Sequence, residues 1–286
     1  MAYQRILTIQ DISCVGQCSL TVALPILSAC GHETAALPTA VLSTHTGRFQ
    51  GYTFRDLTDD IPGICAHWER EGLDFSAVYT GYLASARQIA LVRDVIRSRL
   101  RPGGVLIVDP AMADDGRLYS GFGTDVVDAM RTLCAEADYI LPNVTEAALL
   151  AGLPYPEQAG SASEQIDCAY AEQLAAGAAA HAEQTVLLTG VSFEPGKTGV
   201  FLWRDGKSCY YAHEKSPCGG YGTGDVFASA FTGTLLNGRT AERAARLAAD
   251  YTARCAARTA QDPAHWYGLE FEPELPWLIR RLEDRE

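Results

Sequence analysis

Short apolar runs alternate with amphipathic stretches along most of the chain. Residues 5–10 and 34–38 are β-branched and apolar, which is typical of buried strands, and the helical spacing of residues 19–30 ends at Gly31. The same alternation predicts further strands at 77–80, 105–108, 139–141 and 185–188. It also predicts helices at 56–71, 86–100 and 124–136, a helix that begins at 145, and a long helix that ends at 182. Continuous apolar strands separated by helices indicate a parallel sheet covered on both faces. We therefore predict a three-layer α/β/α fold with a central, mainly parallel sheet.

One departure from this alternation lies late in the chain. Residues 199–204 and 208–213 both read as strands, and Asp205-Gly206 between them is a preferred hairpin turn. We find no internal repeat, low-complexity segment or linker, so residues 1–286 are expected to form a single domain.

Composition narrows the functional classes. The chain is 48% hydrophobic and 20% charged, as expected of a globular protein, and its formal charge of −12 argues against a nucleic-acid partner. The N-terminus lacks a signal-peptide pattern, and no apolar stretch approaches the length of a membrane span. Nine cysteines without an export signal indicate reduced, mostly structural thiols, and hence a cytoplasmic protein with no membrane association.

The most distinctive stretch, residues 218–231, begins with glycines and continues into an apolar, helix-compatible segment. Gly222 and Gly224 flank Thr223, and backbone N–H groups at such a helix start form an anion site. Asp225 follows in the first turn, where it could accept a proton from a group that attacks the anion. The alternative is an ordinary glycine turn with a helix-start aspartate.

Polar or small residues also follow the predicted strands, where ligands bind in open parallel sheets. These residues are Asp11, Thr46-Gly47, Gly81-Tyr82, Asp109, Asn143 and Thr189-Gly190. Turn preference explains any one of them, but their common position indicates a site. The chain lacks the G-x-x-x-x-G-K-[ST], G-x-G-x-x-G and G-x-S-x-G patterns, which argues against P-loop NTPases, dinucleotide enzymes and serine hydrolases.

Taken in order, several segments resemble the vitamin B6 (pyridoxal) kinases of the ribokinase-like superfamily. The matching segments are Ile9-Gln10 with Gly16, Ser43-Thr44-His45-Thr46-Gly47, Thr80-Gly81-Tyr82, Asp109-Pro110 with Asp114, Pro142-Asn143 with Glu146-Ala147, and Gly222-Thr223-Gly224-Asp225. The resemblance implies a ribokinase-like fold. It also implies ATP-dependent phosphorylation of the 5′-hydroxymethyl group of pyridoxal, pyridoxine or pyridoxamine.

The resemblance also assigns roles. Asp225 matches the family's catalytic base, and Gly222, Thr223 and Gly224 match its anion hole. Asp109 and Glu146 match acidic residues near the phosphates and Mg²⁺. For Glu146 the alternative is that an acidic residue is favoured at a helix start whatever the function. The nucleotide side further includes Asn143, Thr189, Gly190 and Thr223, and the vitamer pocket includes Asp11, Thr46, Gly47 and Tyr82. A homodimer is expected by the same resemblance, and a requirement for a monovalent cation such as K⁺ stays open.

Three chemical expectations follow from these assignments. An aspartate of ordinary low pKa is a weak base, so positioning and charge neutralisation would supply most of the catalysis. Asp11 stands where the family commonly has Ser, and its carboxylate would favour a pyridinium nitrogen or an aminomethyl group. Alternatively, Ser13 takes the Ser role and Asp11 only caps the turn. Tyr82 either stacks on the vitamer ring or belongs to the core.

Other functions remain open. A hydroxymethylpyrimidine kinase is the nearest alternative, because its substrate has a similar ring and hydroxymethyl group, and sugar kinases are less favoured. A protein that binds B6 compounds without turnover is the alternative from another class, although such a protein would have no use for Asp225 beside an anion site.

Overall fold

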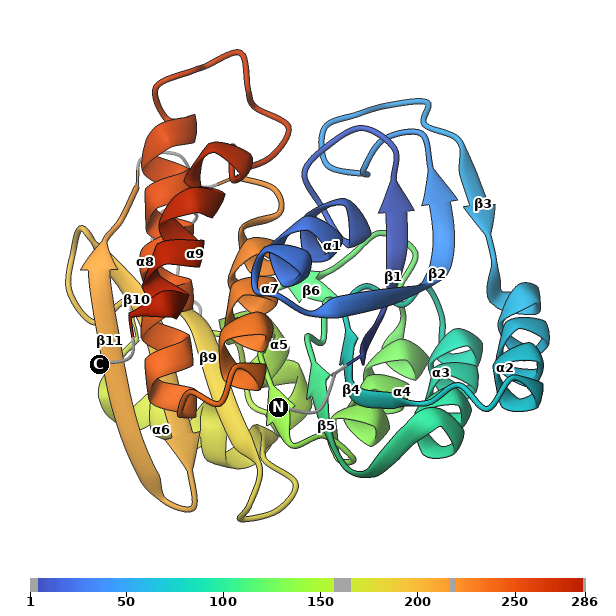
Figure 1. Ribbon diagram of the computed structural model, residues 1–286. Helices are drawn as coiled ribbons and strands as arrows, with labels where there is room; N and C mark the ends of the chain where they lie inside the picture. Colours follow the sequence, from blue (N-terminus) through green and yellow to red (C-terminus); the bar gives the residue numbers. More distant parts are fainter. Residues whose placement is uncertain (1–4, 157–165, 217–219, 285–286) are drawn as a thin grey trace. The chain divides into compact units, whose positions relative to one another are not determined.

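The computed structural model describes residues 5–156, 166–216 and 220–284, and it divides into two compact units. Unit 1 comprises Met1–Val105 and Ser216–Glu286, and unit 2 comprises Leu106–Lys215. Figure 1 shows the helices and strands of both. The prediction of a single domain stays a prediction, and each unit is described by itself.

The sheet of unit 1 is mostly parallel. Its central strand β1 (Arg5–Ser13) pairs in parallel with β2 (Glu33–Leu42) and β4 (Phe75–Thr80), and the short β3 (Phe54–Asp56) adds to β2 in antiparallel fashion. Ile6, Leu7 and Ile9 of β1 are fully buried. A continuous apolar strand of this kind requires cover on both faces, and helices provide it.

The helices of unit 1 come from both ends of its sequence. They are α1 (Leu20–Ala29), α2 (Ile61–Arg70), α3 (Ala86–Arg99), α7 (Thr223–Leu236), α8 (Ala241–Thr259) and α9 (Leu275–Glu283), with 3-10 turns at Thr58–Asp60 and Glu272–Glu274. α7 packs between α1 and α8 (Figure 1). This approach requires a glycine, because a Cβ at Gly233 would lie 2.4 Å from Cys30 Sγ of the α1 C-cap. The last part of α7 is thereby held close to the end of α1.

Unit 2 contains both parallel and antiparallel strands and its own helices. β5 (Leu100–Val108), β8 (Tyr139–Ile140) and β9 (Thr185–Val191) run in parallel, and β10 (Lys197–Arg204) and β11 (Lys207–Glu214) extend the sheet in antiparallel fashion. The remaining elements are β6 (Ala113–Asp114), β7 (Arg117–Leu118), α4 (Thr124–Cys134), α5 (Val144–Ala151) and α6 (Cys168–Ala178). Asp205 and Gly206 both have positive φ, as the predicted hairpin turn requires.

The predicted α/β class with a mainly parallel sheet is confirmed, but several boundaries were wrong. β1 and β2 continue to Ser13 and Leu42, beyond the predicted ends, because Ile12 and Ser13 still pair with Val41 and Leu42. The predicted helix at 56–71 begins only at Ile61, after β3 and a 3-10 turn. The helix predicted up to 182 ends at Ala178, and part of the segment before it lies outside the described residues.

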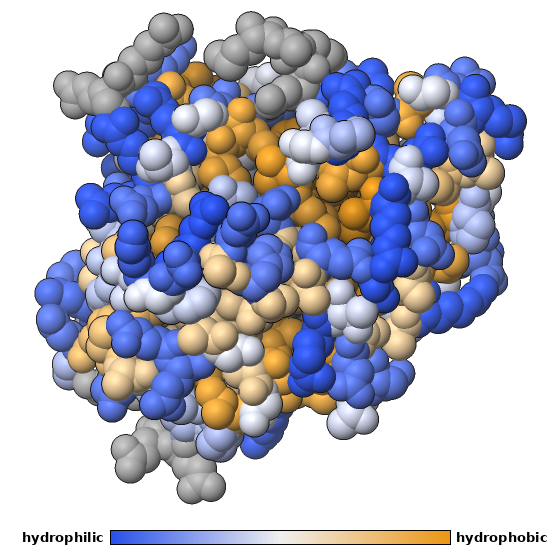
Figure 2. All heavy atoms as spheres, turned by 90° about the horizontal axis from the view of Figure 1, so that it is seen from below, coloured by the Kyte–Doolittle hydropathy of each residue, from blue (hydrophilic) through white to orange (hydrophobic). Residues whose placement is uncertain are grey.

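Figure 2 shows one face of the molecule, on which hydrophilic side chains are spread widely and hydrophobic ones show between them. No helix within the described residues is long and apolar enough to cross a membrane. The eight cysteines described by the structure carry free thiols. Cys218, the ninth, lies outside the described residues.

Candidate active site

Asp11 lies inside β1 rather than after it, at an irregularity in the pairing with β2 between Gln10 and Ile12. Irregularities of this kind re-aim a side chain that would otherwise follow the regular alternation of the strand. The Asp11 carboxylate is 5% exposed. It accepts hydrogen bonds from Ser19 Oγ at 2.5 Å and from Ser13 Oγ at 3.1 Å. Burial raises the pKa of Asp11, and the two serine hydroxyls oppose that rise.

The glycine turn predicted before α7 is present. Gly222 is the helix N-cap with a left-handed backbone (φ 77°), and a Cβ there would lie 1.8 Å from the backbone carbonyl of Gln17. A glycine is therefore required both for its conformation and for its close approach to another backbone segment. Thr223 Oγ donates to the Gly220 carbonyl at 2.5 Å. Cys218 and Gly219, which begin this stretch, lie outside the described residues.

Asp225 follows in the first turn of α7. Burial raises its pKa from 3.8 to about 7, the backbone N–H of Ser19 opposes the rise, and the negative charge of Asp11 adds to it. The expectation of an ordinary low pKa was therefore wrong. A carboxyl that titrates near neutral pH is a considerably stronger base than an exposed aspartate, and it suits proton transfer at physiological pH.

His45 joins three segments of unit 1. Its Nδ1 accepts from the Gly47 N–H at 3.0 Å, so its Nε2 carries the proton and donates to the Tyr267 carbonyl at 2.9 Å. Burial lowers the pKa of His45, which favours the neutral ring. A Cβ at Gly16 would lie 2.1 Å from the His45 ring, so the glycine lets the loop after β1 pass against it. The histidine is thus held in one tautomer beside the predicted pocket.

The other predicted pocket residues lie in the same unit. Gly47 packs under the Tyr221 ring, whose nearest carbon would be 2.1 Å from an added Cβ, and Thr46 beside it is exposed. Tyr82 is half-buried after β4, and burial raises its pKa to about 12, with a further contribution from the charge of Asp11. Tyr82 is not fully buried, which favours the pocket over the core for this residue.

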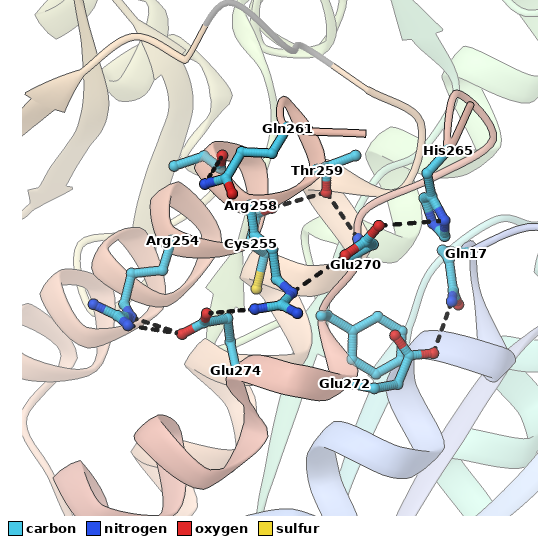
Figure 3. Close-up of polar contacts among 12 residues, drawn as sticks. Gln17, Arg254, Cys255, Arg258, Thr259, Gln261, His265, Glu270, Glu272 and Glu274 are labelled. Carbon is cyan, nitrogen blue, oxygen red and sulfur yellow. Dashed lines mark hydrogen bonds and ion pairs between the residues drawn. The ribbon is translucent and has the colours of Figure 1, made fainter. Parts of the chain in front are cut away.

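The C-terminal segment supports the loop that enters α1. The Gln17 N–H donates to the Tyr267 carbonyl at 3.2 Å, and its side-chain amide donates to Glu272 at 2.7 Å (Figure 3). Ion pairs of Arg258 with Glu270 at 3.2 Å and Arg254 with Glu274 at 2.9 Å tie the same segment to α8 (Figure 3). Gln17 is also the residue whose carbonyl Gly222 approaches. The glycine turn therefore contacts a loop that Tyr267 and Glu272 hold by hydrogen bonds.

In unit 2, residues predicted for the nucleotide side come together at the ends of parallel strands. Asp109 directly follows β5 and is 9% exposed, and Asn143 follows β8 as the N-cap of α5. Asn143 and Glu146 form a capping box, in which Asn143 Oδ1 accepts from the Glu146 N–H at 2.8 Å. The Asn143 amide also donates to the Ala113 carbonyl at 2.8 Å, which holds the β6–β7 hairpin to the helix start.

Both carboxylate oxygens of Glu146 are engaged by backbone groups. Its Oε1 accepts from the Met112 N–H at 3.0 Å, and its Oε2 accepts from the Asn143 N–H at 2.9 Å. Burial, and then the charge of Asp109, raise the pKa of Glu146. These contacts leave Glu146 poorly suited to direct contact with a metal, whereas Asp109 suits a Mg²⁺ that retains most of its waters. No group of three or more metal-ligating side chains occurs within the described ranges.

Thr189 and Gly190 lie within β9, not after it as predicted. The Thr189 N–H donates to the Pro142 carbonyl at 2.9 Å, and Thr189 forms a parallel bridge with Asn143. Gly190 is exposed and has a positive φ of 73°. The strand continues past its predicted end because Val191 still pairs with Gly199 of β10, and Thr189 lies beside Asn143.

Several residues of the unit 1 site were missed by the sequence reasoning. Ser19 was read only as the start of a helix, and nothing in the sequence relates Gln17 to Glu272, which lies 255 positions away. His45 belonged to a motif but was given no role. Ser19 could have been identified only from its hydrogen bond to Asp11, which also accepts from Ser13. That bond depends on how the chain returns from β1 into α1.

Comparisons with known proteins agree with this geometry. The sequence pattern of the phosphomethylpyrimidine kinase family matches residues 27–268. The chain is similar to the pyridoxine/pyridoxal/pyridoxamine kinase of Bordetella avium, with 27% identity over 94% of this chain and 93% of the relative. The crystal structure of pyridoxal kinase from Lactobacillus plantarum superposes with a TM-score of 0.89 at 31% identity, covering 99% of each chain.

Two further structures carry ligands. A Bacteroides thetaiotaomicron protein assigned to the phosphomethylpyrimidine kinases, in a crystal form with pyridoxal, has 33% identity and a TM-score of 0.85 over 98% of this chain and 96% of that one. Pyridoxal kinase from Leishmania donovani, in complex with ADP and pyridoxamine, has a TM-score of 0.80 at 23% identity over 98% and 96% of the two chains, and shares the fold. The chain therefore belongs to the phosphomethylpyrimidine kinase family, and it shares the ribokinase-like fold of the Lactobacillus plantarum pyridoxal kinase.

Proposed function

We propose that this protein phosphorylates the 5′-hydroxymethyl group of vitamin B6 compounds with ATP. The observation that carries the proposal is the carboxyl group of Asp225, whose pKa is about 7. Asp225 lies in the first turn of α7, directly after the left-handed Gly222. A base of this strength beside an anion site suits transfer of a phosphoryl group to an alcohol. The names of the Bordetella and Lactobacillus relatives support a B6 vitamer as the acceptor.

The chemistry assigns separate tasks to Asp225 and to the turn before it. The hydroxymethyl oxygen forms a bond to the γ-phosphorus, the bond from that phosphorus to the β-γ bridging oxygen breaks, and ADP leaves. Asp225 accepts the proton of the hydroxyl group. The N–H groups at the start of α7, around Gly222, Thr223 and Gly224, stabilise the negative charge of the transferring group.

We assign the vitamer pocket to Asp11, Thr46, Gly47 and Tyr82, with His45 as an additional neutral ring beside them. An ionised Asp11 attracts a pyridinium nitrogen or an aminomethyl group more strongly than the usual Ser would. Ser13 and Ser19 both donate to this carboxylate, so the three side chains act together rather than as alternatives. Asp11→Ser should therefore lower the preference for pyridoxamine relative to pyridoxine.

We assign the nucleotide and its Mg²⁺ to unit 2, with Asp109 as the carboxylate on the metal side. When bound, Mg²⁺ neutralises phosphate charge. Asn143 and Glu146 hold the backbone around Asp109, and Thr189 and Gly190 line the nucleotide side. The complex of the Leishmania kinase with ADP supports adenine nucleotides as the donor class. A homodimer is part of the same proposal, to be checked by light scattering.

A second candidate is phosphorylation of hydroxymethylpyrimidine, a pyrimidine related to the phosphomethylpyrimidine that the description of the matching family names. The two reactions share the acceptor hydroxymethyl group, so the same base and anion site serve either. They differ in the ring, where the carboxylate of Asp11 distinguishes a basic pyridine from a pyrimidine.

The decisive experiment is an ATP- and Mg²⁺-coupled assay with pyridoxal, pyridoxine, pyridoxamine, hydroxymethylpyrimidine and ribose, each measured in K⁺ and in Na⁺ buffer. We expect kcat/KM for at least one vitamer to exceed that for the pyrimidine by more than about tenfold, a margin of 1.4 kcal/mol. A higher value for the pyrimidine supports the second candidate. Vitamer binding without phosphorylation in either buffer refutes the kinase proposal in favour of a binding protein.

A further inference from the structure

A fully buried glutamine, Gln88 in the first turn of α3, forms hydrogen bonds to three other segments of unit 1. Its Oε1 accepts from the Ala84 N–H at 2.7 Å. Its Nε2 donates to the Thr39 carbonyl of β2 at 3.0 Å, and to Thr58 Oγ1 in the 3-10 turn at 2.9 Å. Both hydrogens of the amide nitrogen are thereby used, and the amide oxygen has a donor as well.

The spacing of Ser85 and Gln88 is that of a capping box, but the bonds are different. Ser85 Oγ accepts from the Gln88 N–H at 3.2 Å, as in the motif. The Gln88 side chain, however, reaches past Ser85 to the N–H of Ala84. Its amide nitrogen faces two oxygen atoms, to which an ionised glutamate could not donate. Helix capping alone therefore does not account for this glutamine.

These bonds converge on the loop after β4, residues 81–85, which carries Tyr82. The loop begins with the Gly81 N–H, which donates to the Ile9 carbonyl of β1 at 3.2 Å. Thr39 Oγ1 donates to the Tyr82 carbonyl at 3.4 Å, while the carbonyl of the same threonine accepts from the buried glutamine. With the bond to the Ala84 N–H, the backbone is held before, at and after Tyr82.

We propose that Gln88 is a positioning residue for the vitamer pocket, which fixes the backbone that carries Tyr82. Tyr82 is only half-buried, so the core does not hold its ring on all sides and the place of the ring depends on the loop. Gln88 is 0% exposed and therefore acts through the loop rather than by touching substrate. This inference rests on the proposed kinase function, and it deepens that proposal by naming what shapes the acceptor side.

Gln88→Met tests the role directly, because methionine keeps the length of the side chain and removes its three hydrogen bonds. The Ala84 N–H and the Thr39 carbonyl each lose a buried partner, and the loop is expected to shift. The probe is pyridoxine, which has no aldehyde to react with lysines, and its Kd is measured by titration calorimetry without nucleotide. That Kd should rise about tenfold, while KM for ATP stays within about twofold of wild type. An unchanged Kd overturns the proposal.

A double-mutant cycle with Tyr82→Ala separates positioning of Tyr82 from a general structural role. If Gln88 acts through the tyrosine ring, Gln88→Met should change the Kd of pyridoxine less than about twofold once the ring has been removed. A loss of stability alone would lower Tm in both backgrounds and would not produce this coupling. The same fold-change in Kd in both backgrounds overturns the proposal.

Gln184→Met is the matched control, since Gln184 of unit 2 is also 0% exposed and has the same pattern of bonds. Its Nε2 donates to the Cys134 and Ala137 carbonyls at 2.6 and 2.7 Å, and its Oε1 accepts from the Ala180 N–H at 2.9 Å. The substitution should lower Tm as Gln88→Met does and leave the Kd of pyridoxine unchanged. An equal rise of Kd in this control overturns the proposal, because the rise would then report general loosening.

Thr39→Val keeps the proposal testable if Gln88→Met does not fold. Valine has the same branched shape and suits a buried strand, and it removes only the hydroxyl bond to the Tyr82 carbonyl. The Kd of pyridoxine should rise about threefold, and not in the Tyr82→Ala background. An unchanged Kd in Thr39→Val overturns the proposal in that case. Wild-type protein that binds pyridoxine without phosphorylating it refutes the proposed function instead, a result distinct from any change of Kd in the variants.

Discussion

Replacing Asp11 by Asn removes a negative charge that raises the pKa of Asp225. The substitution keeps the size of the side chain and its ability to accept from the Ser19 and Ser13 hydroxyl groups. Asp225 must be deprotonated to accept the proton of the hydroxymethyl group. We therefore expect kcat/KM for a vitamer to rise with pH in both proteins, and to rise at lower pH in Asp11→Asn.

The size of the shift follows from the order of its causes. Burial is the first cause of the rise from 3.8 to about 7 and is unaffected by the substitution, so the pKa of Asp225 should remain well above 3.8. A single neighbouring charge in a partly buried site contributes about one pH unit. At pH 6, a base of pKa about 7 is about one-tenth ionised, and a base of pKa about 6 is half ionised. The activity at pH 6, relative to each protein's own plateau, should differ about fivefold.

The assay measures kcat/KM for one vitamer at saturating Mg-ATP between pH 5 and 9. Because kcat/KM reports ionisations of the free reactants, the vitamer's own titration appears in both profiles and cancels when they are compared. Normalising each profile to its plateau removes the loss of binding expected when Asp11 loses its charge. The quantity compared is the pH at half-maximum.

Asp59→Asn provides the control, because Asp59 is an exposed acid of the same unit, paired with Arg87 at the surface. It removes the same charge without approaching the site, and the pH at half-maximum should not move. If Asp11→Asn leaves that pH unchanged or raises it, the two carboxylates do not interact and the electrostatic reasoning is refuted.

Three further predictions concern other parts of the site. Asp225→Asn should lower kcat about 10²- to 10⁴-fold. It should also raise Tm more at pH 8 than at pH 5, since the raised pKa of this half-buried acid means that folded-state stability is lost as pH rises from 3.8 through about 7. Equal Tm gains at the two pH values would contradict this. Gly222→Ala should abolish activity. Gly238 has a similar φ of 82° but no atom within 4 Å of an added Cβ, so Gly238→Ala should only lower Tm. Equal losses of activity in the two variants would show that backbone strain alone causes the loss. Asp109→Asn should raise the Mg²⁺ concentration for half-maximal activity about tenfold. Glu146→Gln should mainly lower the free energy of unfolding, by about 1–3 kcal/mol. The reverse pattern would identify Glu146 as the metal-side carboxylate.

Local chemistry was the part of this molecule most open to prediction. Glycines in a turn before an apolar helix carry their own structural requirement, so the turn at Gly222 and the place of Asp225 in the first turn of α7 could be predicted from neighbouring residues alone. The Asp205-Gly206 hairpin is confirmed for the same reason. Strand ends were less predictable, because the ladder partners that carried β1 through Asp11 and β9 through Thr189 lie elsewhere in the chain.

The strength of the base could not be predicted from any local pattern. A sequence shows that Asp225 is an aspartate, but its pKa depends on burial by distant segments and on the charge of Asp11, more than 200 positions away. The same holds for Glu146, whose carboxylate looked like a metal ligand until its two oxygens were found on backbone N–H groups.

By itself, the sequence determined the α/β class, the glycine turn before α7 and the residue types available at the strand ends, because spacing and backbone preference are local properties. Only the tertiary structure decided which of those residues meet. It brought Ser19 against Asp11, and it set Gln17 against both the glycine turn and Glu272. Contacts between distant segments and the exclusion of water arise only when the chain packs, and these set both the geometry and the pKa of the base.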